Sequence, residues 1–193
     1  MGIILFVIGI EYLVMMLIFL GLAVLATKHM YYMKKEIGIY EHERGWENVL
    51  FNGIIPVILA ILSPQIGPVP FLCSISAIMS DKFASELGVL GGNPVNLRDL
   101  KPAKPGTSGA ISQFGTIMSA GGSVMIGIVS IFLFNLDPLV GLYISIIGFI
   151  GSFIDSILGV FEEMKIGTKG TTNLLCSLSA GIIGHLAVIY RVF

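Results

Sequence analysis

Two acidic residues, two lysines and a glycine-rich turn carry the chemistry that this sequence could perform. Asp81 and Glu86 stand near the end of an apolar segment, and Lys101 and Lys104 follow in a loop rich in glycine and proline. The loop ends in the turn 106–109 (GTSG), directly before another apolar segment. Carboxylates hold Mg²⁺ together with phosphate oxygens, and lysines neutralise phosphate charge. The set predicts a site for a metal and a phosphorylated ligand.

The turn 106–109 is predicted to open a helix over 110–134. Backbone N–H groups at a helix start, with the positive end of the helix dipole, bind anions. Taken alone, such a turn is more often a basic loop with a Thr or Ser cap, and the Walker A order is absent. Joined to the acidic segment before it, the turn predicts phosphate binding. The residues concerned are Gly106, Thr107, Ser108, Gly109 and, on the preceding helix, Ser85.

Two of the apolar segments carry a polar stripe at helical spacing. The stripes are Ser74, Asp81, Ser85 and Gly88 in one segment, and Ser145, Gly148, Ser152, Asp155, Ser156 and Gly159 in the other. Helix packing alone would account for the small residues, but ionisable residues at membrane depth are costly and mark functional sites. We expect Asp81 and Asp155 to share Mg²⁺, with Glu86 orienting a lysine or ligating the metal.

Amide side chains begin two further apolar segments. Asn48 and Asn52 follow Arg44 at one-turn spacing, and Asn173 follows a threonine-rich turn. These amides could bind a substrate or bridge helices, and Asn173 could also cap its own helix. Both roles stay open for them. Lys34 and Lys35, earlier in the chain, are expected on a solvated face with the acidic residues that follow.

The composition places these residues in a membrane. The 193 residues are 55% hydrophobic and 12% charged, and a spanning helix needs roughly 20 mostly apolar residues. Six segments qualify: 2–26, 47–62, 69–90, 110–134, 138–160 and 172–190. The second is expected to be short and bounded by Pro64. The sequence thus predicts one all-α, polytopic membrane domain over 1–193, beginning with an N-terminal helix over 2–26.

The charged residues predict the orientation in the lipid bilayer. With six spans, almost all Lys and Arg residues fall in the three alternate loops that follow the first, third and fifth segments. The positive-inside rule places those loops and the site in the cytoplasm, and both termini outside. The net charge of −1 argues against a nucleic-acid partner.

Four stretches in a fixed order resemble a known family. They are RGWENVLFNG (44–53), SDKFASELGVL (80–90), LKPAKPGTSGAISQFGT (100–116) and GSFIDSILG (151–159), followed by Asn173. The chain from about residue 44 onward resembles the transmembrane protein 19 family, which includes phytyl-phosphate kinases. The Asp, Ser, Lys and Gly-Thr pattern is distantly similar to CTP-dependent dolichol and phytol kinases.

The resemblance implies a kinase that uses CTP or another nucleotide to convert a polyprenyl monophosphate to its diphosphate. It implies that Asp81, Glu86, Lys101, Lys104, Thr107, Ser108 and Asp155 belong to the nucleotide and metal site, and that Arg44, Asn48 and Asn52 belong to the substrate side. Family members often carry further hydrophobic segments before the Arg44 element, where this chain has one. How the lipid tail is enclosed stays open, and a second copy of the chain could complete the site.

Other functions fit the same residues. A cytidylyltransferase would use the same nucleotide site but transfer CMP to a lipid phosphate. A small transporter or channel would line a path with the two polar stripes, although a path needs polar residues along its whole length. The Gly121-Gly122 pair could serve a homodimer or packing within one chain.

Overall fold

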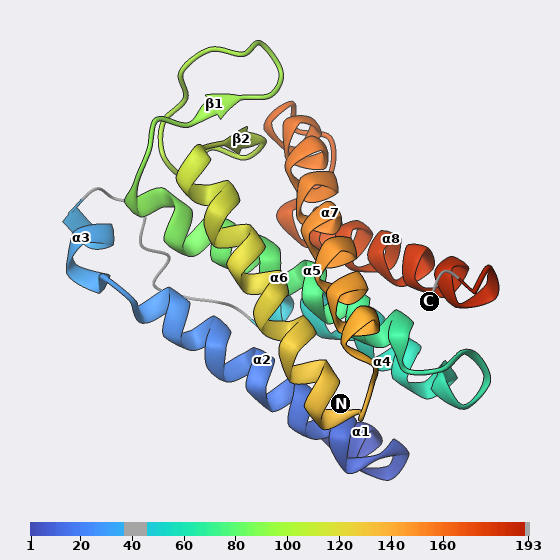
Figure 1. Ribbon diagram of the computed structural model, residues 1–193. Coiled ribbons are helices and arrows are strands. Elements are labelled where there is room, and N and C mark those ends of the chain that lie inside the picture. Colours follow the sequence, from blue (N-terminus) through green and yellow to red (C-terminus); the bar gives the residue numbers. More distant parts are fainter. Residues whose placement is uncertain (37–45, 192–193) are drawn as a thin grey trace.

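The chain folds as a bundle of helices with a small two-stranded hairpin at one end (Figure 1). The structure, a computed structural model, describes residues 1–36 and 46–191. The helices are α1 (Gly2–Ile8), α2 (Ile10–Lys28), α3 (Tyr31–Glu36), α4 (Trp46–Ile66), α5 (Val69–Leu87), α6 (Gln113–Leu133), α7 (Pro138–Glu163) and α8 (Lys169–Ile189), with the 3₁₀ turn η1 (Gly88–Leu90) after α5. The strands β1 (Val95–Asn96) and β2 (Ala110–Ile111) pair in antiparallel register.

The predicted all-α, polytopic membrane architecture is confirmed. Among the described residues, five helices are long and apolar enough to cross a membrane: α2, residues 49–66 of α4, α6, α7 and α8. The remaining predicted span is α5, which carries Asp81, Lys82 and Glu86. Every residue of α5 from Val69 to Lys82 is buried, and the helix contacts all five of the others. The neighbouring helices therefore shield this polar helix from lipid.

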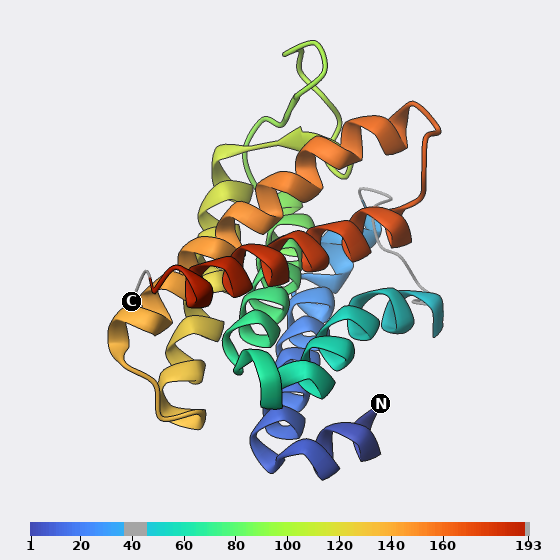
Figure 2. The same ribbon diagram turned by 90° about the vertical axis from the view of Figure 1, so that its right-hand side faces the viewer.

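The long helices alternate in direction. Ser76 and Ser80 of α5 meet Ser123 and Ser119 of α6, so these two helices are antiparallel. The contact of Ala77 with Gly151 continues that of Ser76 with Gly148, so α7 runs parallel to α5. The 91–112 loop and α3 lie at one end of the bundle, and the α6–α7 connection and α1 lie at the other (Figures 1 and 2). We call the first of these the loop end. The alternation agrees with six crossings.

Two predicted helix boundaries are wrong at the start of the chain. The segment 2–26 is not one helix, because Gly9 has an extended backbone (φ 173°, ψ 141°) that separates α1 from α2. The second segment does not stop before Pro64, because α4 continues through this residue to Ile66. Proline is tolerated inside helices at membrane depth, where neighbouring groups satisfy the carbonyl that it leaves free.

The helix predicted to begin directly after the turn 106–109 begins later. Residues 110–111 pair with β1 instead of entering the helix, and Ser112 then caps α6. The Ser112 hydroxyl accepts a hydrogen bond from the Gly115 N–H at 3.0 Å, which satisfies a free donor of the first turn. At the other end of the chain, α8 starts before the predicted residue 172, because Thr168 and Thr171 form a capping box.

Candidate functional site

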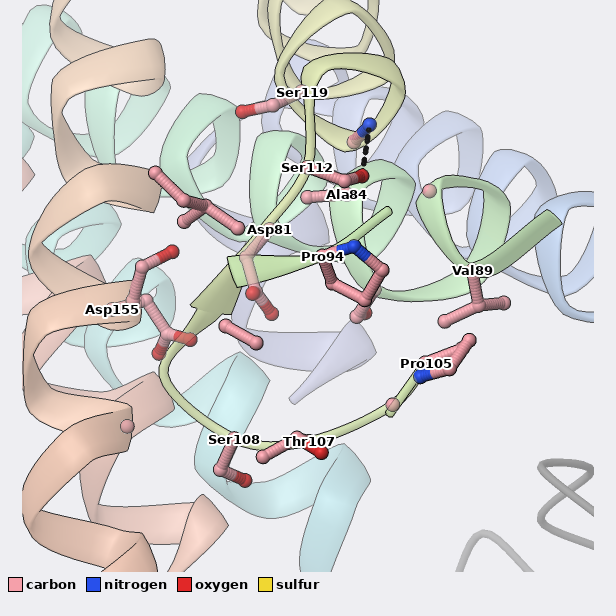
Figure 3. Close-up of a pocket in the computed structure, with 18 of the residues that line it drawn as sticks. Asp81, Ala84, Val89, Pro94, Pro105, Thr107, Ser108, Ser112, Ser119 and Asp155 are labelled. Carbon is pink, nitrogen blue, oxygen red and sulfur yellow. Dashed lines mark hydrogen bonds between the residues drawn. The ribbon is translucent and has the colours of Figure 1, made fainter. Parts of the chain in front are cut away.

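Glycines bring α5 and α7 into backbone contact. A Cβ atom placed on Gly148 would lie 2.6 Å from Cβ of Ser76, and one on Gly151 would lie 2.5 Å from Cβ of Ala77. Any larger residue would force the helices apart. One turn beyond Ala77 and Gly151, the parallel helices carry Asp81 and Asp155, so the close approach brings these two carboxylates to the same level (Figure 3).

The Asp81 side chain is buried, that of Asp155 is half-buried, and the two carboxylates are close enough to interact directly. Asp81 is 8% exposed, and Oδ1 of Asp155 is buried without a hydrogen-bond partner in the described part of the chain. Lys82 and Lys169 are the cations whose charges reach Asp155. Two buried anions side by side are unfavourable unless a cation or a proton joins them. The structure thus brings Asp81 and Asp155 together, and their sharing of a metal stays a prediction.

These residues fit Mg²⁺ held jointly with a phosphate ligand. No group of three or more His, Cys, Asp or Glu side chains able to hold a metal occurs among the described residues, so the protein offers no complete cage. Mg²⁺ commonly takes one or two carboxylates and fills its remaining positions with water and phosphate oxygens. The unpartnered oxygen of Asp155 and the neighbouring Asp81 match that donor set.

A chain of hydroxyl groups fixes the helices beneath the carboxylates. Ser80 and Ser119 share a hydrogen bond between their Oγ atoms at 2.7 Å, and Ser119 Oγ donates to Ser152 Oγ at 3.0 Å. The chain joins α5, α6 and α7. Because Ser80 precedes Asp81 and Ser152 lies one turn before Asp155, it sets the positions of both acids.

The turn 106–109 packs its backbone on α7. Gly106 and Gly109 have φ values of 84° and 72°, which glycine adopts without strain. A Cβ on Gly109 would lie 2.6 Å from the backbone nitrogen of Val160, so only glycine lets the turn come this close. The Ser108 hydroxyl donates to Oε1 of Glu162 at 3.2 Å and ties the turn to the same helix.

The acids, the turn and the start of α6 enclose one cavity of about 190 Å³ at the loop end of the bundle. The predicted site residues that line it are Asp81, Ser85, Glu86, Gly106, Thr107, Ser108, Gly109 and Asp155. Gly88 and Gly115 touch along their backbones, which holds the first turn of α6 at the cavity wall. The positive end of the α6 dipole therefore faces the cavity, as the sequence predicts, although the helix begins later than expected.

Other predicted site residues lie elsewhere. Lys101 and Lys104 are exposed and are not among the described residues that line the cavity. The Lys101 ammonium lies 3.6 Å from the carboxylate of Asp99, and both side chains are exposed. Asn52 and Asn173 are buried outside the cavity lining. Their side chains contain amide atoms without a hydrogen-bond partner among the described residues. The side chain of Asn48 and all of Arg44 fall outside the described residues. The functional roles of all six stay predictions.

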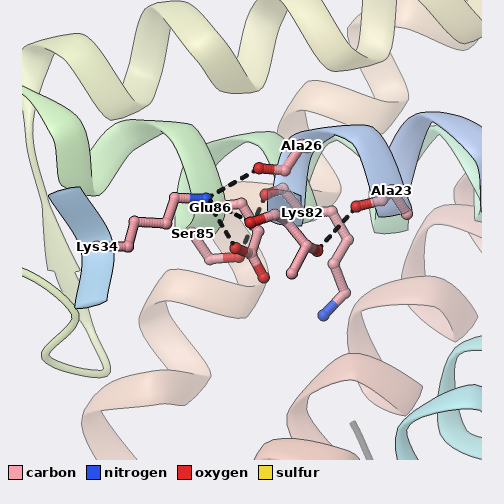
Figure 4. A network of polar contacts seen from close by, with 7 residues as sticks. Ala23, Ala26, Lys34, Lys82, Ser85 and Glu86 are labelled. Carbon is pink, nitrogen blue, oxygen red and sulfur yellow. Dashed lines mark hydrogen bonds and ion pairs between the residues drawn. The ribbon is translucent and has the colours of Figure 1, made fainter. Parts of the chain in front are cut away.

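Lys34 shows where the sequence prediction was wrong. It was expected on a solvated face, but it is 2% exposed and lines the cavity. Its Nζ donates to the carbonyl oxygens of Ala26 at 2.9 Å and Thr27 at 3.1 Å, and to Oε2 of Glu86 at 3.2 Å (Figure 4). A lysine just past a helix end can bond the last carbonyls, which is the signal that could have found it. Lys169 and Glu162 also line the cavity and were not predicted there.

The buried Lys34–Glu86 pair predicts a stability test. Glu86→Gln leaves the Lys34 ammonium without its anion, and loss of one partner of a buried pair costs about 3 kcal/mol. We expect a lower midpoint of thermal denaturation in detergent, and partial recovery when Lys34→Met is added. Lys101→Met, which breaks an exposed pair, is the control and should change the midpoint far less. An equal loss in both single variants would contradict this account.

The fold and the cavity define a class: a polytopic, all-α integral membrane protein with a polar site at one end of the bundle. Residues 1–186 match the family model described as "Integral membrane protein DUF92", and the chain belongs to this family. The family is similar to the transmembrane protein 19 proteins, so the resemblance found in the motifs holds at that level.

A relative gives the second comparison. The chain is 35% identical over 189 residues to the uncharacterized membrane protein MJ0933 of Methanocaldococcus jannaschii. The match covers 95% of this chain and 79% of the relative. No solved structure matches the chain.

Proposed function

We propose that this protein is a membrane-embedded kinase that transfers a phosphoryl group from a nucleotide, CTP in the first instance, to a polyprenyl monophosphate. One observation carries the proposal. Two neighbouring carboxylates, one of which has a buried oxygen without a hydrogen-bond partner among the described residues, face the same cavity as a glycine turn and the positive end of a helix. This is a donor set for a metal next to a donor set for phosphate.

The protein groups have separate tasks in this reaction. Asp81 and Asp155 would hold Mg²⁺, which neutralises phosphate oxygens when bound. The backbone of residues 106–109 and the first turn of α6 would orient the nucleotide phosphates. Lys169 supplies positive charge at the cavity. A lipid monophosphate already has a nucleophilic oxygen, so positioning and charge neutralisation are the main needs of the reaction.

The orientation follows from the charges. The loop end carries most of the lysine residues, and the positive-inside rule would place it in the cytoplasm, where nucleotides are found. Both termini would then lie outside. Lys101 and Lys104, on the exposed loop beside the cavity, would meet the nucleotide if the loop moves toward it on binding.

Label transfer tests the reaction. Purified protein, Mg²⁺ and geranylgeranyl or phytyl monophosphate are incubated with CTP or ATP labelled in the γ- or the α-phosphate. We expect γ-label in a prenyl diphosphate. Transfer of the α-label with release of pyrophosphate would instead establish a cytidylyltransferase, which the same cavity could serve. No transfer of either label from either nucleotide would reject both reactions and favour transport.

A further inference from the structure

A second hollow lies on the outside of the bundle, next to the cavity. It has a volume of about 220 Å³ and is lined by Leu22, Leu25 and Ala26 of α2, by His29 directly after that helix, and by Phe83 and Leu87 of α5. We call it the α2–α5 groove. All of its side chains except that of His29 are apolar. Leu25 is 66% exposed on a helix that is long and apolar enough to cross a membrane, so the groove opens toward the lipid.

The groove and the cavity share a wall. Ala26 lines the groove, whereas the next residue, Thr27, lines the cavity. In the same way, Glu86 lines the cavity and Leu87 lines the groove. Lys34 closes this wall, because its Nζ bonds the carbonyls of Ala26 and Thr27 and the carboxylate of Glu86 (Figure 4). An apolar groove open to the bilayer thus lies on one side of this wall, and a buried ammonium group lies on the other side, in the lining of the cavity.

We propose that the α2–α5 groove holds the first part of the hydrocarbon chain of the lipid substrate, with its phosphate at Lys34. This inference rests on the proposed function for the identity of the lipid. An amphiphile with an apolar chain and an anionic end matches the two neighbouring surfaces, one apolar and one cationic. The rest of the chain stays in the bilayer.

The position of Lys34 gives the site its selectivity. The ammonium bonds two carbonyl oxygens and one carboxylate, and a phosphate dianion in the cavity would be a stronger anionic partner than a carboxylate. The wall keeps the chain out of the polar cavity while the phosphate reaches into it. The groove therefore favours a prenyl chain that fills it over one too short to fill it, since the longer chain buries more apolar surface there.

Photo-crosslinking tests the groove without relying on turnover. A prenyl monophosphate with a benzophenone in its chain is bound to the full-length protein in detergent, irradiated, and the labelled peptides are mapped. We expect label in residues 22–29 or 83–87, competed by geranylgeranyl monophosphate. Leu25→Trp should remove this label. Leu20→Trp, on the same helix, 46% exposed and outside the groove lining, is the matched control and should keep it.

Kinetics provide a second measurement. Leu25→Trp should raise KM for geranylgeranyl monophosphate at least about tenfold and leave KM for dimethylallyl monophosphate and the nucleotide unchanged. Label confined to other helices, or label that survives Leu25→Trp, would overturn the proposal that the groove binds the lipid chain. The kinase proposal would stay intact. Label at the groove in a protein that transfers no phosphate would support the groove and reject the kinase. Should Leu25→Trp not fold, the map on the unaltered chain decides.

Discussion

Asp155→Asn should abolish phosphoryl transfer without destabilising the protein. The substitution removes one of the two carboxylates that face the cavity, and we expect activity to fall by at least about 10²-fold. It also removes a carboxyl group that lies beside a second one, Asp81. The midpoint of thermal denaturation without Mg²⁺ should therefore stay the same or rise, as is common when a residue serves activity at the expense of stability.

Metal binding gives this prediction a readout besides activity. A ligand that binds only the folded state raises the denaturation midpoint as its concentration increases. Mg²⁺ with nucleotide should do so in the unaltered protein and lose this effect in Asp155→Asn and in Asp81→Asn. An Mg²⁺-dependent shift that persists in both variants would show that the two acids do not bind the metal.

Asp137→Asn is the matched control on the same helix. Asp137 caps the opposite end of α7, where its carboxylate accepts a hydrogen bond from the Leu139 N–H at 2.7 Å. Asparagine caps a helix about as well as aspartate, so this change removes the same charge without losing the cap. We expect wild-type activity and the same Mg²⁺-dependent shift.

Gly109→Ala should impair nucleotide binding more than its backbone strain accounts for. A non-glycine residue at φ 72° costs about 1–2 kcal/mol. In addition, the new Cβ would meet the Val160 backbone nitrogen at 2.6 Å, which cannot move without shifting α7. The turn would then leave its place at the cavity. We expect KM for the nucleotide to rise at least about tenfold, equivalent to about 1.4 kcal/mol of binding free energy.

Substitutions at three further glycines distinguish the effect of backbone strain from the effect of the steric contact between the turn and α7. Gly159→Ala introduces the steric contact without backbone strain, because Gly159 is helical and its new Cβ would lie 2.5 Å from the Gly109 nitrogen. This variant should also raise KM for the nucleotide. Gly67→Ala introduces the strain alone, at φ 76° with no atom within 4 Å of the added Cβ. Gly121→Ala introduces neither. Gly67→Ala and Gly121→Ala should leave KM for the nucleotide unchanged. If Gly67→Ala raised this KM as much as Gly109→Ala does, the packing of the turn on α7 could not be the cause of the rise.

The parts of the site that the sequence predicts are those set by helical periodicity. Asp81 and Asp155 share their stripes with small residues, and small residues mark helix contacts, so their meeting could be foreseen. The place of the turn 106–109 could be foreseen too, because it lies between the acidic helix and the next one. Local pattern was sufficient for these features.

The features that the sequence does not predict depend on long-range contacts. The rule that a lysine after a helix end can bond the last carbonyls applies equally to Lys34 and Lys35, and the long-range contact with α5 selects Lys34. The start of α6 depends on pairing between residues 95–96 and 110–111. The exposed positions of Lys101 and Lys104 depend on the path of the loop around that hairpin, which residue types alone do not specify.

The burial of α5 has a consequence for how the protein reaches its membrane. A charged residue costs up to about 2.5–3.5 kcal/mol during insertion, the full value applying at the centre of an isolated span, and α5 carries three charged residues in its C-terminal part. The helices that shelter it include α6, α7 and α8, which the ribosome makes afterwards. The segment that carries Asp81 is thus the one least able to enter the bilayer unaided, and its integration is coupled to the synthesis of the helices that follow.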